Sequence, residues 1–256
     1  MRSSSDAAIF EIVSKATRVF LTMIVEPQVR KFCGPLFFTS SSITPKNNIE
    51  SSGSFGLVSI GGKKLLVTCW HVLEGFRELH TKNPALRFGI GIGGRHPVSV
   101  SLDDLLKMKV DDDRRCDLAV FDISDALEQV AASNLEFFNL SANRPPKVCN
   151  GDVLYLIGFP GKGRIESETS VGFPRQVIGV QASLIGEFSF MSSVVRLNLD
   201  ESDYAGISGA PCFVVREGAP IKLIGFVTGF APNQMNILQF TYAKFIGQDG
   251  VIHYMA

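Results

Sequence analysis

Short apolar runs separated by turn-forming residues are the feature that most constrains the fold of this chain. The 256 residues include 24 glycines and 12 prolines, and from about residue 30 these residues, with Asn, Asp and Ser, interrupt the apolar sequence. Runs this short fit strands, whereas a helix needs a longer pattern that repeats every three to four residues. About ten such runs at roughly even spacing predict an all-β sandwich or barrel. They span residues 54–60, 64–68, 86–92, 117–123, 153–157, 176–184, 193–199, 211–215, 221–227 and 237–242.

A helical pattern is expected mainly near the N-terminus. Apolar residues recur at helical spacing over residues 9–24, and Pro27 lies just past the expected end of this helix. A rival interpretation makes residues 17–26 a strand, because Val, Phe, Thr and Ile dominate that stretch. Residues 102–108 and 125–132 are expected to form short helices within connections. The N-terminal helix is a candidate for self-association or for binding a regulatory partner, although packing on the protein's own body is the commoner outcome.

The charge and cysteine content exclude several classes of function. Lys plus Arg and Asp plus Glu each number 25, so no basic excess points to nucleic acid or to an anionic membrane. The five cysteines are widely spread and include no C-x-x-C pair, which argues against a disulfide framework and a structural zinc site. Charged residues interrupt the N-terminal apolar stretch, so neither a signal peptide nor a membrane span is expected. These observations predict a cytoplasmic protein with neither cofactor nor metal.

One histidine stands out from the other three. His71 follows the apolar run Leu65–Val67 directly after Thr68, Cys69 and Trp70, and the apolar sequence continues beyond it. The other histidines lie in polar or terminal surroundings. A single histidine beside a buried strand is more often an ordinary structural residue than a catalyst, so this motif alone decides little.

One aspartate is also placed unusually. Asp117 opens the apolar run Leu118–Phe121, which brings its carboxylate to the edge of the core, whereas Asp111–Asp113 are expected to be solvated. A carboxylate at such an edge needs hydrogen-bond donors, and an imidazole N–H is among the best.

The third motif is a serine between glycines. Gly206-Ile207-Ser208-Gly209 precedes an apolar run, and the glycines permit a tight turn that aims the backbone N–H groups of Gly206 and Ser208 inward. Two such donors can form an oxyanion hole, although an ordinary glycine-rich turn is an equally good interpretation of this motif alone. The chain order His, Asp, Ser differs from the order Ser, acid, His of the α/β-hydrolases.

Taken together, these three motifs make the chain from about Gly53 onward resemble the chymotrypsin/trypsin-like serine peptidases, in the style of the bacterial and organellar high-temperature-requirement type. The resemblance rests on residues 67–73, 117–120 and 206–211, and the run at 153–160 is similar to the first strand of that family's second barrel. It implies a chymotrypsin-like double antiparallel β-barrel with an N-terminal helix.

The resemblance also implies the division of the chain and the roles of the site residues. Residues 1–30 would be the helical segment, 31–142 the first barrel and 143–256 the second. The sequence itself favours the turn-rich stretch Asn139–Asp152, with its Pro145-Pro146 pair, as the boundary between the two halves. Ser208 would be the nucleophile, His71 the general base and Asp117 the residue that orients it, with Gly206 and Ser208 forming the oxyanion hole.

The expected substrate pocket involves four residues. Ser202 is expected near its floor, with Glu201 or Asp203 there if the alignment is shifted by one residue. Thr228, Gly229 and Phe230 belong to a run similar to the strand that lines the family's cleft. Thr228 is also expected to support the triad aspartate. A neutral floor and the large Phe230 favour small or medium apolar side chains in the substrate.

The chain departs from the family pattern at one position next to the serine, and other functions remain as alternatives. Ile207 stands where digestive enzymes carry an aspartate that pairs with a newly cut N-terminus, so no activation of that kind is expected. A catalytically silent binding module and an esterase are the alternative functions to a peptide- or protein-cleaving enzyme. The G-x-G-x-x-G pattern at residues 89–94 is interpreted as part of a β-hairpin, since Pro97 and an alternating pattern follow it where nucleotide binding needs a helix.

Overall fold

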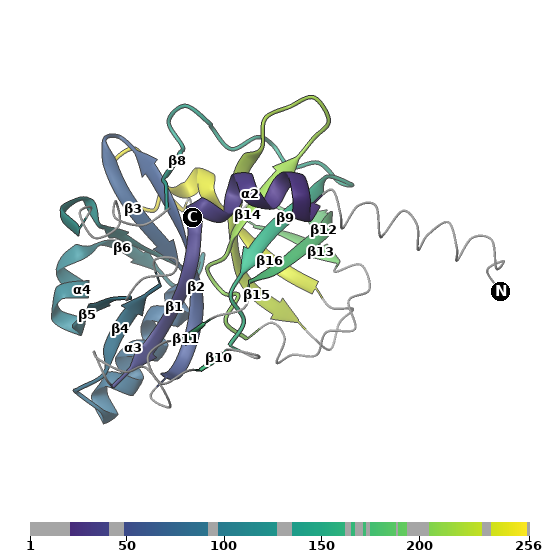
Figure 1. The fold of residues 1–256 in the computed structure, drawn as a ribbon. Coiled ribbons are helices and arrows are strands. Elements are labelled where there is room, and N and C mark those ends of the chain that lie inside the picture. Colours follow the sequence, from purple (N-terminus) through teal and green to yellow (C-terminus); the bar gives the residue numbers. More distant parts are fainter. Residues whose placement is uncertain are drawn as a thin grey trace.

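The computed structural model of the chain describes residues 21–40, 49–91, 97–126, 135–161, 165–166, 171–172, 175–187, 189–193, 205–231 and 237–254. Its elements are mostly strands arranged in two large sheets (Figure 1), so the predicted all-β, double β-barrel fold class is confirmed. None of the helices within these ranges is long and apolar enough to cross a membrane.

The first sheet contains eight strands within the described residues, in the order β5-β4-β1-β2-β3-β7-β6, with β8 beside β2. All neighbours are antiparallel except β2 and β8, which are parallel. The strands are β1 (Cys33–Thr39), β2 (Ile49–Ile60), β3 (Lys63–Thr68), β4 (Arg87–Ile90), β5 (Val98–Val100), β6 (Lys109–Asp113), β7 (Leu118–Asp122) and β8 (Phe138–Asn139).

The second sheet closes into a barrel in the order β12-β13-β16-β15-β14-β9. Every neighbouring pair in it is antiparallel. The strands are β9 (Val153–Gly158), β12 (Gln176–Ile185), β13 (Ser189–Ser193), β14 (Pro211–Val215), β15 (Lys222–Ala231) and β16 (Ile237–Tyr242), and a separate pair is formed by β10 (Ile165–Glu166) and β11 (Val171–Gly172). The chain passes from the first sheet to the barrel within residues 140–152.

Alternating side chains of the first sheet fill two cores, as the period of two along a strand requires. In β2, Phe55 and Leu57 pack on one side, whereas Val58 and Ile60 join the core shared with the closed barrel. The helix α3 (Trp70–Lys82) covers the first of these cores, and its Phe76 ring lies 5.2 and 5.3 Å from those of Phe38 and Phe88.

The helices correct several sequence-based predictions. In the described part of the N-terminal segment, η1 (Leu21–Val25), α2 (Glu26–Val29) and η2 (Arg30–Phe32) are helical, so the rival strand is wrong there, and residues 1–20 lie outside the described residues. Pro27 lies inside the first turn of α2 rather than beyond the helix, a position where a proline removes no helical hydrogen bond. This segment crosses the top of the barrel beside β14 and β9 (Figure 1).

The remaining helices agree with the prediction in part. The helix predicted at residues 102–108 is confirmed by α4 (Leu102–Met108), which Ser101 caps by accepting a hydrogen bond from the Asp104 backbone. Of residues 125–132, the described part belongs to the 3-10 turn η3 (Ser124–Ala126). A further 3-10 turn, η4 (Ala243–Phe245), follows β16. The helix α3 was not predicted.

The strand predicted at residues 193–199 is described only at Ser193, the last residue of β13, and its other residues lie outside the described ranges. Asp111–Asp113 belong to β6 and are not simply solvated, because their carboxylates accept hydrogen bonds from neighbours such as Ile252 and Arg115. The hairpin interpretation of the glycine-rich stretch is confirmed by the antiparallel pairing of β4 with β5.

Candidate active site

His71 is held by the start of α3. The strand β3 ends at Thr68, Cys69 is extended, and α3 begins at Trp70, so His71 occupies the second position of the helix. Val72 and Leu73 are buried in the core beneath. Because Val72 and Leu73 fix this first turn of the helix to the core, the His71 side chain is directed away from the core and is 46% exposed.

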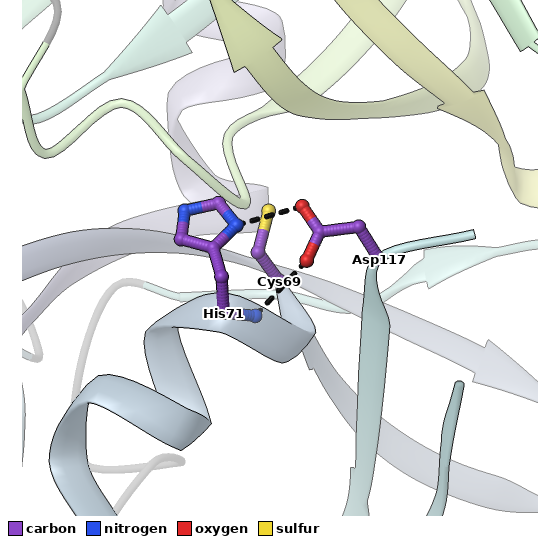
Figure 2. A group of neighbouring side chains, drawn as sticks. All are labelled: Cys69, His71 and Asp117. Atoms are coloured by element: carbon purple, nitrogen blue, oxygen red, sulfur yellow. Dashed lines mark hydrogen bonds and ion pairs between the residues drawn. The ribbon is translucent and has the colours of Figure 1, made fainter. Parts of the chain in front are cut away.

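Asp117 is joined to His71 by two hydrogen bonds. The His71 backbone N–H donates to Asp117 Oδ1 over 2.9 Å, and the His71 Nδ1 lies 2.7 Å from Asp117 Oδ2. Figure 2 shows the imidazole and the carboxylate facing each other. With the aspartate ionised, this contact favours the tautomer that carries a proton on Nδ1 and leaves the Nε2 lone pair free.

The backbone at Asp117 is strained. Its φ is +54°, and it is the one non-glycine residue with positive φ within the described residues. Aspartate tolerates this left-handed region better than most residues, but the conformation still costs about 1–3 kcal/mol and persists only when its surroundings fix it. The second barrel supplies one such constraint, because the buried hydroxyl of Thr241 donates to the Cys116 carbonyl over 2.7 Å.

The loop around Ser208 has its carbonyl groups anchored. The carbonyl of Ala205 accepts from the Gly161 N–H over 2.9 Å, and that of Ile207 accepts from the Ala210 N–H over 2.9 Å. Because the C=O and N–H of a trans peptide point in opposite directions, the N–H groups of Gly206 and Ser208 are turned away from these anchors. Within the described part of the chain, neither N–H donates a hydrogen bond to the protein.

Positive backbone angles make this loop possible. The φ of Gly206 is +97° and that of Gly209 is +86°, in the region where glycine is favoured. A Cβ at Gly209 would also overlap the Ser54 carbonyl and the Thr68 hydroxyl. These two glycines therefore fix the turn that the sequence motif predicted.

The Ser208 loop and the His71 helix meet at shared neighbours. The Ser54 N–H donates to the Ser208 carbonyl over 2.8 Å, and a Cβ at Gly53 would contact both Val72 and that same carbonyl. Among the described residues, no hydrogen bond joins the Ser208 hydroxyl to His71. The half-buried Ser208 therefore lies near the His71 helix through its backbone, without a hydrogen bond from its hydroxyl to the imidazole.

A second link runs through the Val227 carbonyl. It accepts from the Gly209 N–H over 2.8 Å and from the Cys69 thiol over 3.0 Å, so the serine loop and the residue before Trp70 share one acceptor. Burial, followed by the nearby Asp117 carboxylate, raises the pKa of the Cys69 thiol well above its usual range. The thiol is therefore protonated at neutral pH and able to donate this hydrogen bond.

Of the residues predicted to line the substrate pocket, only those of β15 are described by the structure. Ser202 lies outside the described residues. Gly229 and Phe230 are half-buried in β15, where they pair with Gln239 and Leu238 of β16. Phe230 also packs against the core that the barrel shares with the first sheet.

The Thr228 hydroxyl is bonded to neighbours on β16 rather than to Asp117. Its hydroxyl lies 3.4 Å from that of Thr241 and 3.5 Å from the Gln239 carbonyl, and among the described residues it forms no hydrogen bond with Asp117. Thr241 in turn donates to the Cys116 carbonyl, so a chain of hydrogen bonds joins Thr228 to the residue before Asp117.

Sequence reasoning missed Cys69 and Thr241. The Cys69 sulfur lies behind the His71–Asp117 contact (Figure 2), and together these residues are the one group of possible metal ligands within the described part of the chain. The position of Cys69 two residues before His71 was a usable signal. No sequence signal marks Thr241, because its contact with Cys116 joins residues of the two sheets that lie far apart in the chain.

Comparisons with known proteins report no family. No protein-family model and no curated protein matches the sequence. Two solved structures are similar over 83% of this chain, each at 14% identity. One is a thermostable serine protease, AL20, from an extremophilic microorganism, with a TM-score of 0.49 and 91% of its chain covered. The other comes from a study of the coupled folding and binding of the intrinsically disordered VPg protein of Sesbania mosaic virus, with a TM-score of 0.45 and 87% covered. Neither likeness assigns an activity to this chain.

Proposed function

We propose that this chain is a serine endopeptidase in which Ser208, His71 and Asp117 form a catalytic triad. The observation that carries the proposal is the pair of hydrogen bonds between Asp117 and His71, beside a serine loop in which the N–H groups of Gly206 and Ser208 donate to no partner among the described residues. This combination supplies a general base of fixed tautomer, a nucleophile and two donors for a developing oxyanion.

The proposed reaction proceeds through an acyl-enzyme. Ser208 Oγ attacks the peptide carbonyl while its proton passes to His71 Nε2, and the carbonyl oxygen becomes negative. The N–H groups of Gly206 and Ser208 donate to that oxygen. Collapse of the tetrahedral intermediate breaks the C–N bond, and the imidazolium returns the proton to the leaving amine. Water then repeats the sequence on the ester and restores Ser208.

Asp117 acts through the imidazole. Its two contacts, 2.9 Å to the His71 backbone and 2.7 Å to Nδ1, hold the ring and stabilise the imidazolium that forms when Nε2 accepts the proton. Because the Ser208 hydroxyl is not bonded to His71 here, the acylation step requires the two to approach within hydrogen-bond distance when substrate is present.

The finer parts of the proposal follow from the sequence. We place the enzyme among peptidases of the high-temperature-requirement style and expect it to accept small or medium apolar side chains next to the cleaved bond. The buried Ile207 leaves no carboxylate to pair with a new N-terminus, which supports an enzyme made without that activation step. All five cysteines are free thiols, which supports a reducing cytoplasm as its location.

A fluorophosphonate probe tests the proposal, because it reacts only with an activated serine. We expect labelling at Ser208 in the wild type, none in Ser208→Ala, and a rate at least about 10³-fold lower in His71→Ala. Ser141→Ala, which alters an exposed serine in a loop, is the matched control and should label fully. An unlabelled wild type, in an assay where a known serine peptidase labels, would support a silent binding module instead.

A further inference from the structure

The Cys69 thiol gives this site a donor that the proposed triad does not use. Its sulfur, a His71 ring nitrogen and an Asp117 carboxylate oxygen all lie within 4.8 Å of one another. In Figure 2 the sulfur overlaps the dashed line that joins the imidazole to the carboxylate. One sulfur, one imidazole nitrogen and one carboxylate oxygen form a donor set that suits zinc.

We propose that Cys69, His71 and Asp117 bind a thiophilic divalent cation of the zinc class, and that this binding switches the catalytic residues off. The inhibitory part rests on the proposed peptidase function, whereas the binding part does not. The three residues supply three ligands, and the exposed side of His71 leaves a fourth position for water.

Binding requires the donor atoms to rearrange: the sulfur, which lies within 4.8 Å of the other two donor atoms, must come to the separation that the metal imposes, and the nitrogen and oxygen must move apart. Zinc bonds of about 2.0–2.3 Å in tetrahedral geometry separate ligand atoms by about 3.3–3.6 Å. The Nδ1–Oδ2 distance of 2.7 Å must therefore open by about 0.6 Å. Rotation of the two partly exposed side chains accomplishes this, because His71 is 46% and Asp117 22% exposed.

Protons and charges balance in the bound state. The metal takes the Nδ1 lone pair, so the single proton of the neutral imidazole moves to Nε2. The Cys69 thiol loses its proton to solvent and binds as a thiolate. One thiolate and one carboxylate then neutralise the two positive charges of the ion.

Burial of the sulfur fits this chemistry. Cys69 is fully buried and its S–H donates to the Val227 carbonyl over 3.0 Å, so without a metal it remains a thiol and is not a nucleophile. A bound cation supplies the positive charge that a buried thiolate lacks. The ion reaches the site from the side of the exposed imidazole, with Cys69 as the floor.

Metal binding blocks the proposed reaction at a defined atom. With Nδ1 on the metal and the proton on Nε2, His71 has no lone pair that can accept the Ser208 proton. Acylation therefore stops without any block of the substrate cleft.

Titration of the Ser208→Ala protein with Co²⁺ tests the binding separately from activity. We expect a saturable near-ultraviolet charge-transfer band of one thiolate bound to cobalt, with one ion per chain, and competition by Zn²⁺. The band should disappear in Cys69→Ser, with affinity at least about tenfold lower. Cys149→Ser removes the exposed cysteine and is the matched control, which should keep the band.

The opposite results overturn the proposal: no band at all, a band that survives Cys69→Ser, or one lost in Cys149→Ser. If Cys69→Ser fails to fold, His71→Ala replaces it, because that side chain is half-exposed, and metal affinity retained in His71→Ala would equally overturn the site.

Peptide cleavage measures the proposed inhibition by the metal. Zn²⁺ should inhibit the wild type at least about tenfold more strongly than Cys69→Ser, each measured against its own activity. An inactive wild type that binds cobalt defeats the peptidase proposal alone, whereas an active wild type that binds neither ion defeats the metal site alone.

Discussion

Replacing Thr241 with valine removes the hydroxyl that anchors the peptide carbonyl before Asp117. Thr241 is 3% exposed, and its hydroxyl donates to the Cys116 carbonyl over 2.7 Å, across the junction of the two sheets. Valine has nearly the same volume, so the substitution removes the hydrogen bond and leaves packing largely intact.

The expected loss of stability follows from the orphaned carbonyl. A buried acceptor without a partner costs about 1–3 kcal/mol, which we take as the fall in the free energy of unfolding. Asp117, with its φ of +54°, loses a constraint at the same time. Relaxation of that strained residue should lengthen its contact with His71, since the conformation persists only while its surroundings fix it.

Urea unfolding measures the first effect and proton NMR the second. The hydrogen-bonded His71 Nδ1 proton of the wild type should give a strongly downfield signal that weakens or moves upfield in Thr241→Val. Thr241→Ser retains the hydroxyl and is the matched control, which should keep the signal. Equal unfolding free energies for wild type and Thr241→Val, with an unchanged Nδ1 signal, would show that the Thr241 hydroxyl does not anchor the Asp117 loop.

Two further predictions concern the serine loop and the barrel. Gly209→Ala should lower the free energy of unfolding by about 2–6 kcal/mol, the sum of a strained backbone at φ +86° and overlap with neighbouring groups, and urea unfolding measures it. Gly62→Ala has the same strain at φ +85° but open space around it, so it should cost only about 1–2 kcal/mol, and equal losses in the two variants would contradict the overlap. The Arg216 guanidinium holds the pKa of Asp152 below its usual range through bonds of 2.7 and 3.0 Å, so the stabilisation is complete above the unfolded pKa of about 3.9 and is lost as the pH falls through the folded pKa. Because Arg216 is partly solvated, the stabilisation by this ion pair should amount to no more than about 1 kcal/mol. Asp152→Asn should remove the corresponding loss of stability at acid pH, which unfolding measured across pH would show. An acid profile equal to that of the wild type would contradict the ion pair's contribution.

The strands were predictable because burial imposes a pattern that the sequence carries locally. The run at residues 117–123 became β7, buried at four successive positions, Leu118–Phe121, because the sheet has a core on both faces. The helix α3 is not evident at first sight, because Val72 and Leu73 continue the preceding apolar run. Their spacing to Phe76 and Leu79 is helical and could have revealed it.

The contacts of the site depend on information that no local pattern contains. The His71–Asp117 pair was predictable as a hypothesis from residue types and order. The positive φ of Asp117 was not, since it depends on how Thr241 from the other sheet holds the preceding carbonyl. The position of the Cys69 sulfur follows from the short distance to Val227 across the two sheets, which sequence order does not encode.

Cleavage of a peptide library by the wild type and by Ser208→Ala is the decisive test of the proposed peptidase, because it measures activity and specificity in one experiment. We expect cleavage by the wild type, with small or medium apolar residues before the cut bond, and a loss of at least about 10⁴-fold in Ser208→Ala. Cleavage that is equal in the two proteins, or absent from a folded wild type, would contradict it.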